Sequence, residues 1–199
     1  MKRLLKAILV MMTSQVAVAS VGIVRNKLLA VLLGPAGVGF FAQLQVLQGF
    51  LQYAATMGMQ QGALKYMAVD RARNQDQLPT TVSTASKTFA AFSVLLLAIC
   101  LPLAKPIASW SLGDASLYLF VIPVIAGVPF LIQTELWQTY LRSGFEMKRY
   151  SATMVTTAVV GLPLVVPLVF IWKQAGLAAH LLIVAVIGYI IARLYANRS

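Results

Sequence analysis

The chain has 199 residues, of which 60% are apolar and 11% charged, and its formal net charge at pH 7 is +11. Soluble domains usually carry about 25% charged residues, so this composition excludes an ordinary soluble protein and indicates an integral membrane protein. The basic residues are dispersed between apolar segments, which argues against nucleic acid as a partner. Because Cys100 is the single cysteine, an intrachain disulfide and a cysteine-based metal site are both excluded.

Apolar windows of roughly 17 to 25 residues, the length that crosses a bilayer core, predict an all-α bundle of six transmembrane helices in a single domain, 1–199. In chain order the predicted spans are 7–33, 40–67, 82–104, 117–141, 150–171 and 177–195. The sixth span is the shortest and follows closely on the fifth, so a re-entrant segment is the alternative there. Residues 68–81 are charged and contain Pro79, and we expect them to form a polar loop.

A GPAGVG segment at residues 34–39 follows the first predicted span. Glycine adopts positive φ without strain and proline suits a first helical turn, so we expect a tight helical hairpin here. The start of the chain also resembles a signal peptide, with an A-x-A site at residues 17–19. Cleavage would leave Arg25 beside a stub too short to span, so an uncleaved first helix is the preferred interpretation.

The basic residues also predict the orientation in the membrane. A cytoplasmic N-terminus places twelve of the sixteen basic residues on the inner side: Lys2, Arg3, Lys6, Lys65, Arg71, Arg73, Lys87, Arg142, Lys148, Arg149, Arg193 and Arg198. Lys105 and Lys173 fall outside, while Arg25 and Lys27 lie within the first span. The positive-inside rule therefore predicts that both termini are cytoplasmic.

Arg25 and Lys27 are unusual because a cation inside a spanning helix costs at least about 2.5 kcal/mol. At 1.5 Å per residue, Arg25 lies about 13 Å and Lys27 about 10 Å before Gly34, a long reach for side chains that snorkel to the headgroups. We therefore predict that they line a polar cavity and accept an anion, with snorkelling as the alternative. Thr13 and Lys27 share one line along the helix and Ser14 and Arg25 a neighbouring one, so one side is predicted to be polar.

The second span carries Gln45, Gln48, Gln52 and Thr56 at helical spacing. Amides in lipid commonly form interhelical hydrogen bonds, each worth about 0.6 kcal/mol. Four aligned polar positions also suit the wall of a water-filled path that offers donors and acceptors to a hydroxyl-rich ligand. Packing and ligand contact are both open interpretations.

Glu135 is the only acid inside a predicted span, and Arg142 follows two helical turns later. The simpler interpretation is a carboxylate neutralised by a basic residue such as Arg142, and the alternative is a proton or cation site. His180, the only histidine, is interpreted in the same way, either as a hydrogen-bonded packing residue or as a proton relay.

The common enzyme motifs are absent from the sequence. It contains no GxSxG, no Walker A loop, no HExxH and no carboxylate pair. We therefore expect no enzymatic activity, no metal and no cofactor.

The segment KLLAVLLGPAGVG at residues 27–39, followed by GALKYMA at residues 62–68, resembles the N-terminal part of O-antigen translocases. These are lipid-linked oligosaccharide flippases of the multidrug and polysaccharide exporter superfamily, and the chain is most similar to the enterobacterial common antigen branch. The resemblance implies a multi-pass protein of the bacterial inner membrane that serves polysaccharide and lipopolysaccharide biosynthesis. Its implied cargo is an undecaprenyl-pyrophosphate-linked glycan.

Such a cargo assigns roles to the candidate residues. Arg25 and Lys27 would hold the pyrophosphate, since a guanidinium binds phosphate oxygens bidentately and an ammonium supplies a point charge. Three glutamines would contact the sugars, namely Gln45, Gln48 and Gln52, while the tail stays among membrane lipids. With no nucleotide site, the driving force would be an ion gradient or consumption of the product, and Glu135 is the candidate for ion coupling.

Members of this family typically have two six-helix lobes around a central cavity. Six spans resemble one lobe, so the resemblance implies a second wall from a homodimer partner or a separate six-helix lobe. Two alternatives stay open. One is a truncated or non-transporting membrane subunit, and the other is a drug or cation antiporter of the same superfamily, which the excess of buried cations over acids disfavours.

Overall fold

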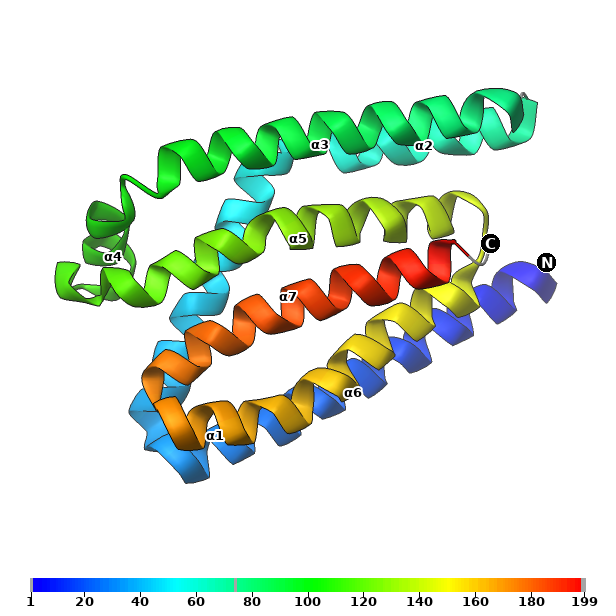
Figure 1. Ribbon diagram of the computed structural model, residues 1–199. Helices are drawn as coiled ribbons and strands as arrows, with labels where there is room; N and C mark the ends of the chain where they lie inside the picture. Colours follow the sequence, from blue (N-terminus) through cyan, green and yellow to red (C-terminus); the bar gives the residue numbers. More distant parts are fainter. Residues whose placement is uncertain (1, 74, 198–199) are drawn as a thin grey trace.

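A computed structural model describes residues 2–73 and 75–197, with side chains described from residue 5 onward except at residues 6 and 75 (Figure 1). This part of the chain is almost entirely helical and contains no strand. Its α-helices are α1 (Lys2–Thr56), α2 (Met59–Arg73), α3 (Leu78–Cys100), α4 (Ala104–Leu112), α5 (Tyr118–Ser143), α6 (Met147–Trp172) and α7 (Gln174–Ala196). Short 3-10 turns, Gln75–Gln77 and Ala115–Leu117, precede α3 and α5.

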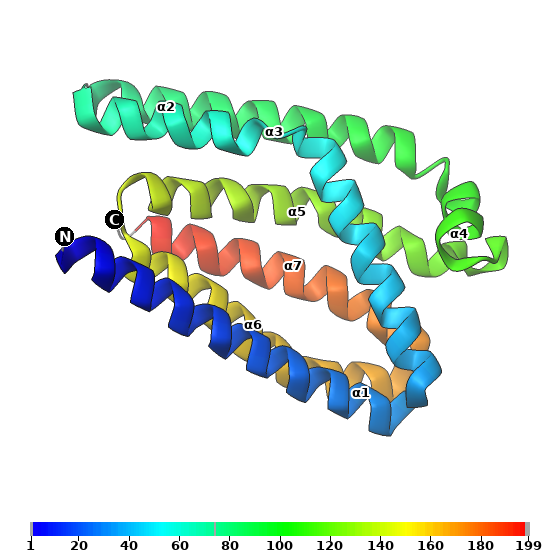
Figure 2. The same ribbon diagram turned by 180° about the vertical axis from the view of Figure 1, so that it is seen from behind.

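Helix α1 is broken at Gly34, whose φ of 71° and ψ of −177° lie in a region that is essentially restricted to glycine. Pro35 follows and begins the second half of the helix, where its missing N–H costs little. The expected break at residues 34–39 is therefore confirmed. The two halves, 2–33 and 35–56, open into a V instead of a tight hairpin, and Figure 2 shows the second half crossing in front of α7 and α5. The reason is packing, because the second half buries its apolar side on α5.

Among the described residues, five helices are long and apolar enough to cross a membrane. The all-helical membrane architecture is therefore confirmed, whereas the count of six spans is not. The difference arises in α1, where the 50-residue stretch Ala7–Thr56 counts once although Gly34 divides it. Helix α7 runs unbroken over 23 residues and is one of these five helices, which favours a full span over the re-entrant alternative.

The second predicted span, 40–67, does not match one continuous helix, and the prediction of where it ends is wrong. Helix α1 stops at Thr56, the backbone takes positive φ at Met57 and Gly58, and α2 then continues to Arg73. Residues 68–81 are consequently mostly helical and do not form the expected loop. Their charges mark the end of the apolar stretch, but alanine and arginine also favour helix, so polarity there does not end the helix.

The remaining predicted spans agree with α3, α5, α6 and α7 to within four residues at each end. The connection between α3 and α5 holds one additional short helix, α4. After α4, the Asp114 carboxylate accepts a hydrogen bond from the Ser116 backbone N–H at 2.8 Å, which lowers the pKa of that exposed carboxyl.

Helix α5 is the centre of the bundle. It packs against α7, α3, α2 and the second half of α1, while α7 packs on α6 and α6 on α1. The helices therefore form a row in the order α3, α5, α7, α6 and first half of α1, and the second half of α1 crosses this row (Figures 1 and 2). The buried side of α5 consists of branched aliphatic residues such as Val124, Val128 and Ile132.

The bundle has two distinct ends. The start of α1, the end of α7, the α2–α3 junction and the α5–α6 junction lie at one end, which we call the terminal end. The break in α1 at Gly34, α4 and the α6–α7 junction lie at the other, which we call the Gly34 end (Figure 1). Six basic residues occupy helix turns at the terminal end, namely Arg71, Arg73, Arg142, Lys148, Arg149 and Arg193. Of the others assigned to the inner side, Arg198 and the side chains of Lys2, Arg3 and Lys6 lie outside the described residues.

Candidate functional site

Arg25 lies between the two halves of α1. Its guanidinium carbon is 4.8 Å from the centre of the Phe41 ring in the second half. The side chain is half-buried, and its Nε atom has no hydrogen-bond partner within the described structure. The ion pairs of the described residues use Glu135 and Glu146 as acids, and neither pairs with Arg25. Arg25 is thus a cation that rests on an aromatic face and keeps donors free.

His180 of α7 approaches the same aromatic ring. Its ring centre is 6.2 Å from that of Phe41, and the residue is only 2% exposed. The expected hydrogen bond is not found at Nδ1, which is buried without a partner in the described part of the chain. Arg25, Phe41 and His180, which we call the Arg25 cluster, therefore come together from the two halves of α1 and from α7.

Gln48 lies two helical turns after Phe41 on the same side of α1. It is 8% exposed, and its Nε2 atom is buried with no hydrogen-bond partner among the described residues. The amide reaches Gly127 of α5, where an added Cβ would lie 3.3 Å from Nε2. Gly127 therefore leaves room for this amide inside the bundle, where Gln48 Nε2 is a buried donor without a partner among the described residues.

The other predicted binding residues are less enclosed. Gln45 and Gln52 are half-buried on the flank of the second half of α1, and Lys27 is exposed. Lys27 does not join Arg25, because residues two positions apart on a helix point in nearly opposite directions. The structure brings Arg25 and Gln48 into the bundle and leaves Lys27 outside it.

The polar residues of the first half of α1 are likewise divided between a buried side and an exposed side. Ser14 is buried and donates to Ser151 of α6 at 3.1 Å, on the side that packs. Thr13 and Ser20 are exposed and donate to carbonyls of their own helix at 2.8 and 2.9 Å. The two neighbouring lines therefore differ in their surroundings, because packing against α6 buries Ser14 and leaves Thr13 and Ser20 exposed.

Glu135 has a basic partner. Arg142 Nη2 lies 3.0 Å from Glu135 Oε1 and 3.0 Å from Thr139 Oγ1, and the guanidinium carbon lies 5.6 Å from the centre of the Tyr150 ring. The geometry matches the interpretation of a carboxylate neutralised by Arg142. Ion coupling at Glu135 stays a hypothesis.

A second ionic cluster at the terminal end was not predicted. Glu146 lies 2.7 Å from Arg149 and 3.8 Å from Arg71, and the Arg71 guanidinium lies 4.4 Å from the centre of the Tyr140 ring. Gly144 accommodates this arrangement, since a Cβ there would collide with the Arg71 guanidinium. Arg71 and Glu146 are far apart in the sequence, so no local spacing signals their contact.

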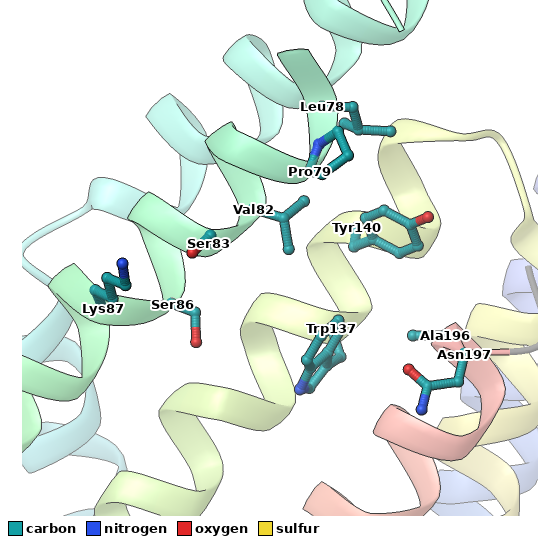
Figure 3. Close-up of a pocket in the computed structure, with 10 residues that line it drawn as sticks. All are labelled: Leu78, Pro79, Val82, Ser83, Ser86, Lys87, Trp137, Tyr140, Ala196 and Asn197. Carbon is teal, nitrogen blue, oxygen red and sulfur yellow. The ribbon is translucent and has the colours of Figure 1, made fainter. Parts of the chain in front are cut away.

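Sequence reasoning also missed a groove between α3 and α7, above α5 (Figure 3). A cavity of about 650 Å³ at the terminal end is lined by residues of all three helices, including Ser83, Lys87, Trp137 and Asn197. A second cavity of about 390 Å³ lies deeper in the bundle. Ser86 and Trp137 line both cavities, so the two are adjacent.

Comparison with known proteins gives one family. The family model described as "Polysaccharide biosynthesis protein" matches residues 4–198, nearly the whole chain. Neither the curated proteins nor the solved structures give a match. The polysaccharide-biosynthesis part of the predicted resemblance is therefore confirmed, while the O-antigen cargo and the one-lobe architecture stay predictions.

Proposed function

Because the chain belongs to the family of polysaccharide biosynthesis proteins and has several helices suited to span a membrane, we propose that it translocates a lipid-linked oligosaccharide. The proposed cargo is an undecaprenyl-pyrophosphate-linked unit, such as an O-antigen or common-antigen unit, and the proposed location is the bacterial inner membrane. Arg25 carries the proposal, because it is a half-buried cation in an apolar helix without an acidic partner among the described residues. The proposed activity is transport and not catalysis.

Magnitudes favour an anionic ligand at Arg25. A cation at this depth costs at least about 2.5 kcal/mol. The cation–π contact with Phe41 offsets about 0.5 to 2 kcal/mol of this cost, depending on how far the pair is desolvated. A pyrophosphate would supply the missing counter-charge, and its oxygens match the planar fork of a guanidinium.

The remaining parts of the cargo need other surfaces. Gln48 and the half-buried Gln45 and Gln52 follow Phe41 along the second half of α1, so we assign them to the hydroxyl-rich glycan. The polyprenyl tail stays among membrane lipids. Lys27 is exposed on the outer side of α1, and we assign it to lipid headgroups or to a partner and not to the Arg25 cluster.

Binding of a polyprenyl pyrophosphate to the purified chain in nanodiscs tests the proposal. Arg25→Ala should weaken binding by about tenfold or more, which corresponds to about 1.4 kcal/mol. Arg25→Lys should restore part of the loss, because charge is kept but the bidentate fork is not. Lys27→Ala is the matched control and should change binding little. If Arg25→Ala binds as wild type does, or if Lys27→Ala has an equal effect, the proposed site is wrong.

We further propose that the terminal end is cytoplasmic. The two halves of α1, with α2 extending the second, would then be two passages, and α3, α5, α6 and α7 four more. Single cysteines at Ala36 and Ser111, both at the Gly34 end, should react with impermeant reagents from the periplasmic side in a Cys100→Ser background. Modification from the cytoplasmic side alone would show that the opposite orientation is correct.

The exposed polar residues of the first half of α1 support a partner. Gln15, Asn26 and Lys27 are exposed, and polar groups facing hydrocarbon cost several kcal/mol each when they lack partners. We propose that a second copy or a separate six-helix lobe covers them. Flipping in proteoliposomes should then appear only with the associated form, and a stable monomer that flips the cargo unaided would contradict this.

The antiporter alternative is less well supported. The acid in the membrane part of the bundle, Glu135, already lies 3.0 Å from Arg142. An antiporter would need that carboxylate free to exchange a proton or cation. A non-transporting subunit would bind no polyprenyl pyrophosphate, so the Arg25 experiment separates it from the proposed flippase.

A further inference from the structure

The groove between α3 and α7 is separate from the Arg25 cluster. The described residues that line it come from α3, α5, α7 and the Asn197 that follows α7, and none comes from α1. Its two cavities, of about 650 and 390 Å³, each fall within the range of about 300–1,000 Å³ that is usual for ligand sites. The groove is therefore large enough for a ligand of its own.

The part of the groove at the terminal end offers hydrogen-bond donors and positive charge. Trp137 Nε1 is buried and has no hydrogen-bond partner among the described residues. Figure 3 shows the Trp137 indole between Ser86 of α3 and Asn197 at the end of α7, with Lys87 at the edge of the cavity. Arg193 lines the adjoining cavity. No acidic residue is among the described residues that line either cavity, so the electrostatics favour an anion.

The deeper part of the groove is apolar. Its walls include Val94 and Leu97 of α3 and Phe130 of α5. Ser86 and Gln133 pair with each other across the floor, at 3.4 and 3.3 Å, and so remove most of their polarity from the groove. The lining thus changes from donors and cations at the terminal end to hydrocarbon towards the middle of the bundle.

We infer that this groove binds one anionic phospholipid from the membrane leaflet at the terminal end. The phosphate lies near Lys87, Arg193 and the Trp137 N–H, and one acyl chain runs along the apolar part. The eleven residue steps from Ser86 to Leu97 extend about 16 Å, which is about half of a 30 Å hydrocarbon core and so matches one leaflet. A soluble anion would leave the apolar part unoccupied, and a neutral lipid would leave the two cations without a counter-charge.

Tryptophan fluorescence with brominated lipids tests this inference. Trp110 and Trp172 are 72% and 56% exposed at the Gly34 end, so Trp110→Phe/Trp172→Phe leaves Trp137 as the single reporter at little structural cost. In vesicles of phosphatidylcholine, brominated phosphatidylglycerol should quench Trp137 at lower mole fraction than brominated phosphatidylcholine does. Each cation near an anionic surface contributes about 1 kcal/mol, so Lys87→Gln and Arg193→Gln should each lower this preference by about fivefold.

Lys105→Gln and Lys173→Gln are the matched controls, because they remove cations at the Gly34 end. They should leave the preference unchanged. Equal quenching by the two lipids, or a preference that survives Lys87→Gln/Arg193→Gln in a protein with an unaltered melting temperature, would overturn the inference. Displacement of phosphatidylglycerol by a polyprenyl pyrophosphate at a lower mole fraction would also overturn it, because the groove would then be a cargo site.

Discussion

Arg142 and Arg25 both lie in apolar helices, and the fold neutralises them differently. Arg142 is 3.0 Å from Glu135 and also bonds Thr139, so the protein supplies its own counter-charge. Arg25 has the Phe41 ring at 4.8 Å and no acidic partner among the described residues. The comparison separates a cation that the fold pairs with an acid from one that has no acidic partner among the described residues. Each of the following substitutions should affect one side of this comparison more than the other.

The largest effect on stability is expected at Gly34, which sets the angle between the halves of α1 and so places Arg25 against Phe41. Gly34→Ala should lower the free energy of unfolding by about 1 to 3 kcal/mol, because φ of 71° with ψ of −177° strains any residue with a Cβ. It should also weaken polyprenyl-pyrophosphate binding. Thermal unfolding in nanodiscs measures the stability.

Gly39→Ala is the control for this substitution. Gly39 has a helical backbone and no atom within 4 Å of an added Cβ, so alanine there should cost nothing. If both variants unfold at the same temperature, strain at Gly34 does not set the geometry of the Arg25 cluster.

The next largest effect is expected at Arg142. Arg142→Ala should lower stability by about 1 to 2 kcal/mol, less than the about 3 to 5 kcal/mol seen when a fully buried pair is broken. The loss is expected to be smaller than for a fully buried pair because the side chains of Arg142 and Glu135 are 23% and 25% exposed. Cargo binding should not change. The double variant Glu135→Ala/Arg142→Ala should lose less stability than the sum of the losses in the two single variants. Strict additivity in this cycle would show that the pair does not interact.

A smaller effect is expected at Gln48. Gln48→Leu should change stability by less than about 1 kcal/mol, since the Nε2 atom makes no hydrogen bond that could be lost. In a flipping assay, Gln48→Leu should change which glycans are moved, and Gln45→Leu and Gln52→Leu should do so as well. Lower stability with unchanged glycan selectivity would assign these glutamines to helix packing.

The smallest effect is expected at Ser14, which lies on the same helix as Arg25 but has a partner in the bundle. Ser14→Ala removes the hydrogen bond to Ser151 and should cost about 0.6 kcal/mol, the average for such bonds in membranes. Ser20→Ala, which removes only a bond within the helix, should cost less. A loss of cargo binding in Ser14→Ala would show that the two sides of the comparison are coupled.

Local sequence patterns determined much of the architecture. Apolar windows located α3, α5, α6 and α7 to within four residues, because a span needs a minimum length of hydrocarbon whatever it packs against. Gly34 and Pro35 marked the break in α1, since backbone freedom is a property of the residue itself. The pairing of Glu135 with Arg142 was also foreseeable, because two helical turns on one helix bring such residues onto one side.

Tertiary structure decided the rest. The sequence treats Arg25 and Lys27 as equivalent cations, and only the packing of α1 on α6 and α7 turns Arg25 inward and leaves Lys27 exposed. Phe41 and His180 meet because the V at Gly34 lays the second half of α1 across α7. The groove beside Trp137 likewise combines three helices. Such contacts join residues far apart in the chain, and a periodicity read over a few helical turns holds no information about them, because side-chain packing between helices sets which face each helix buries.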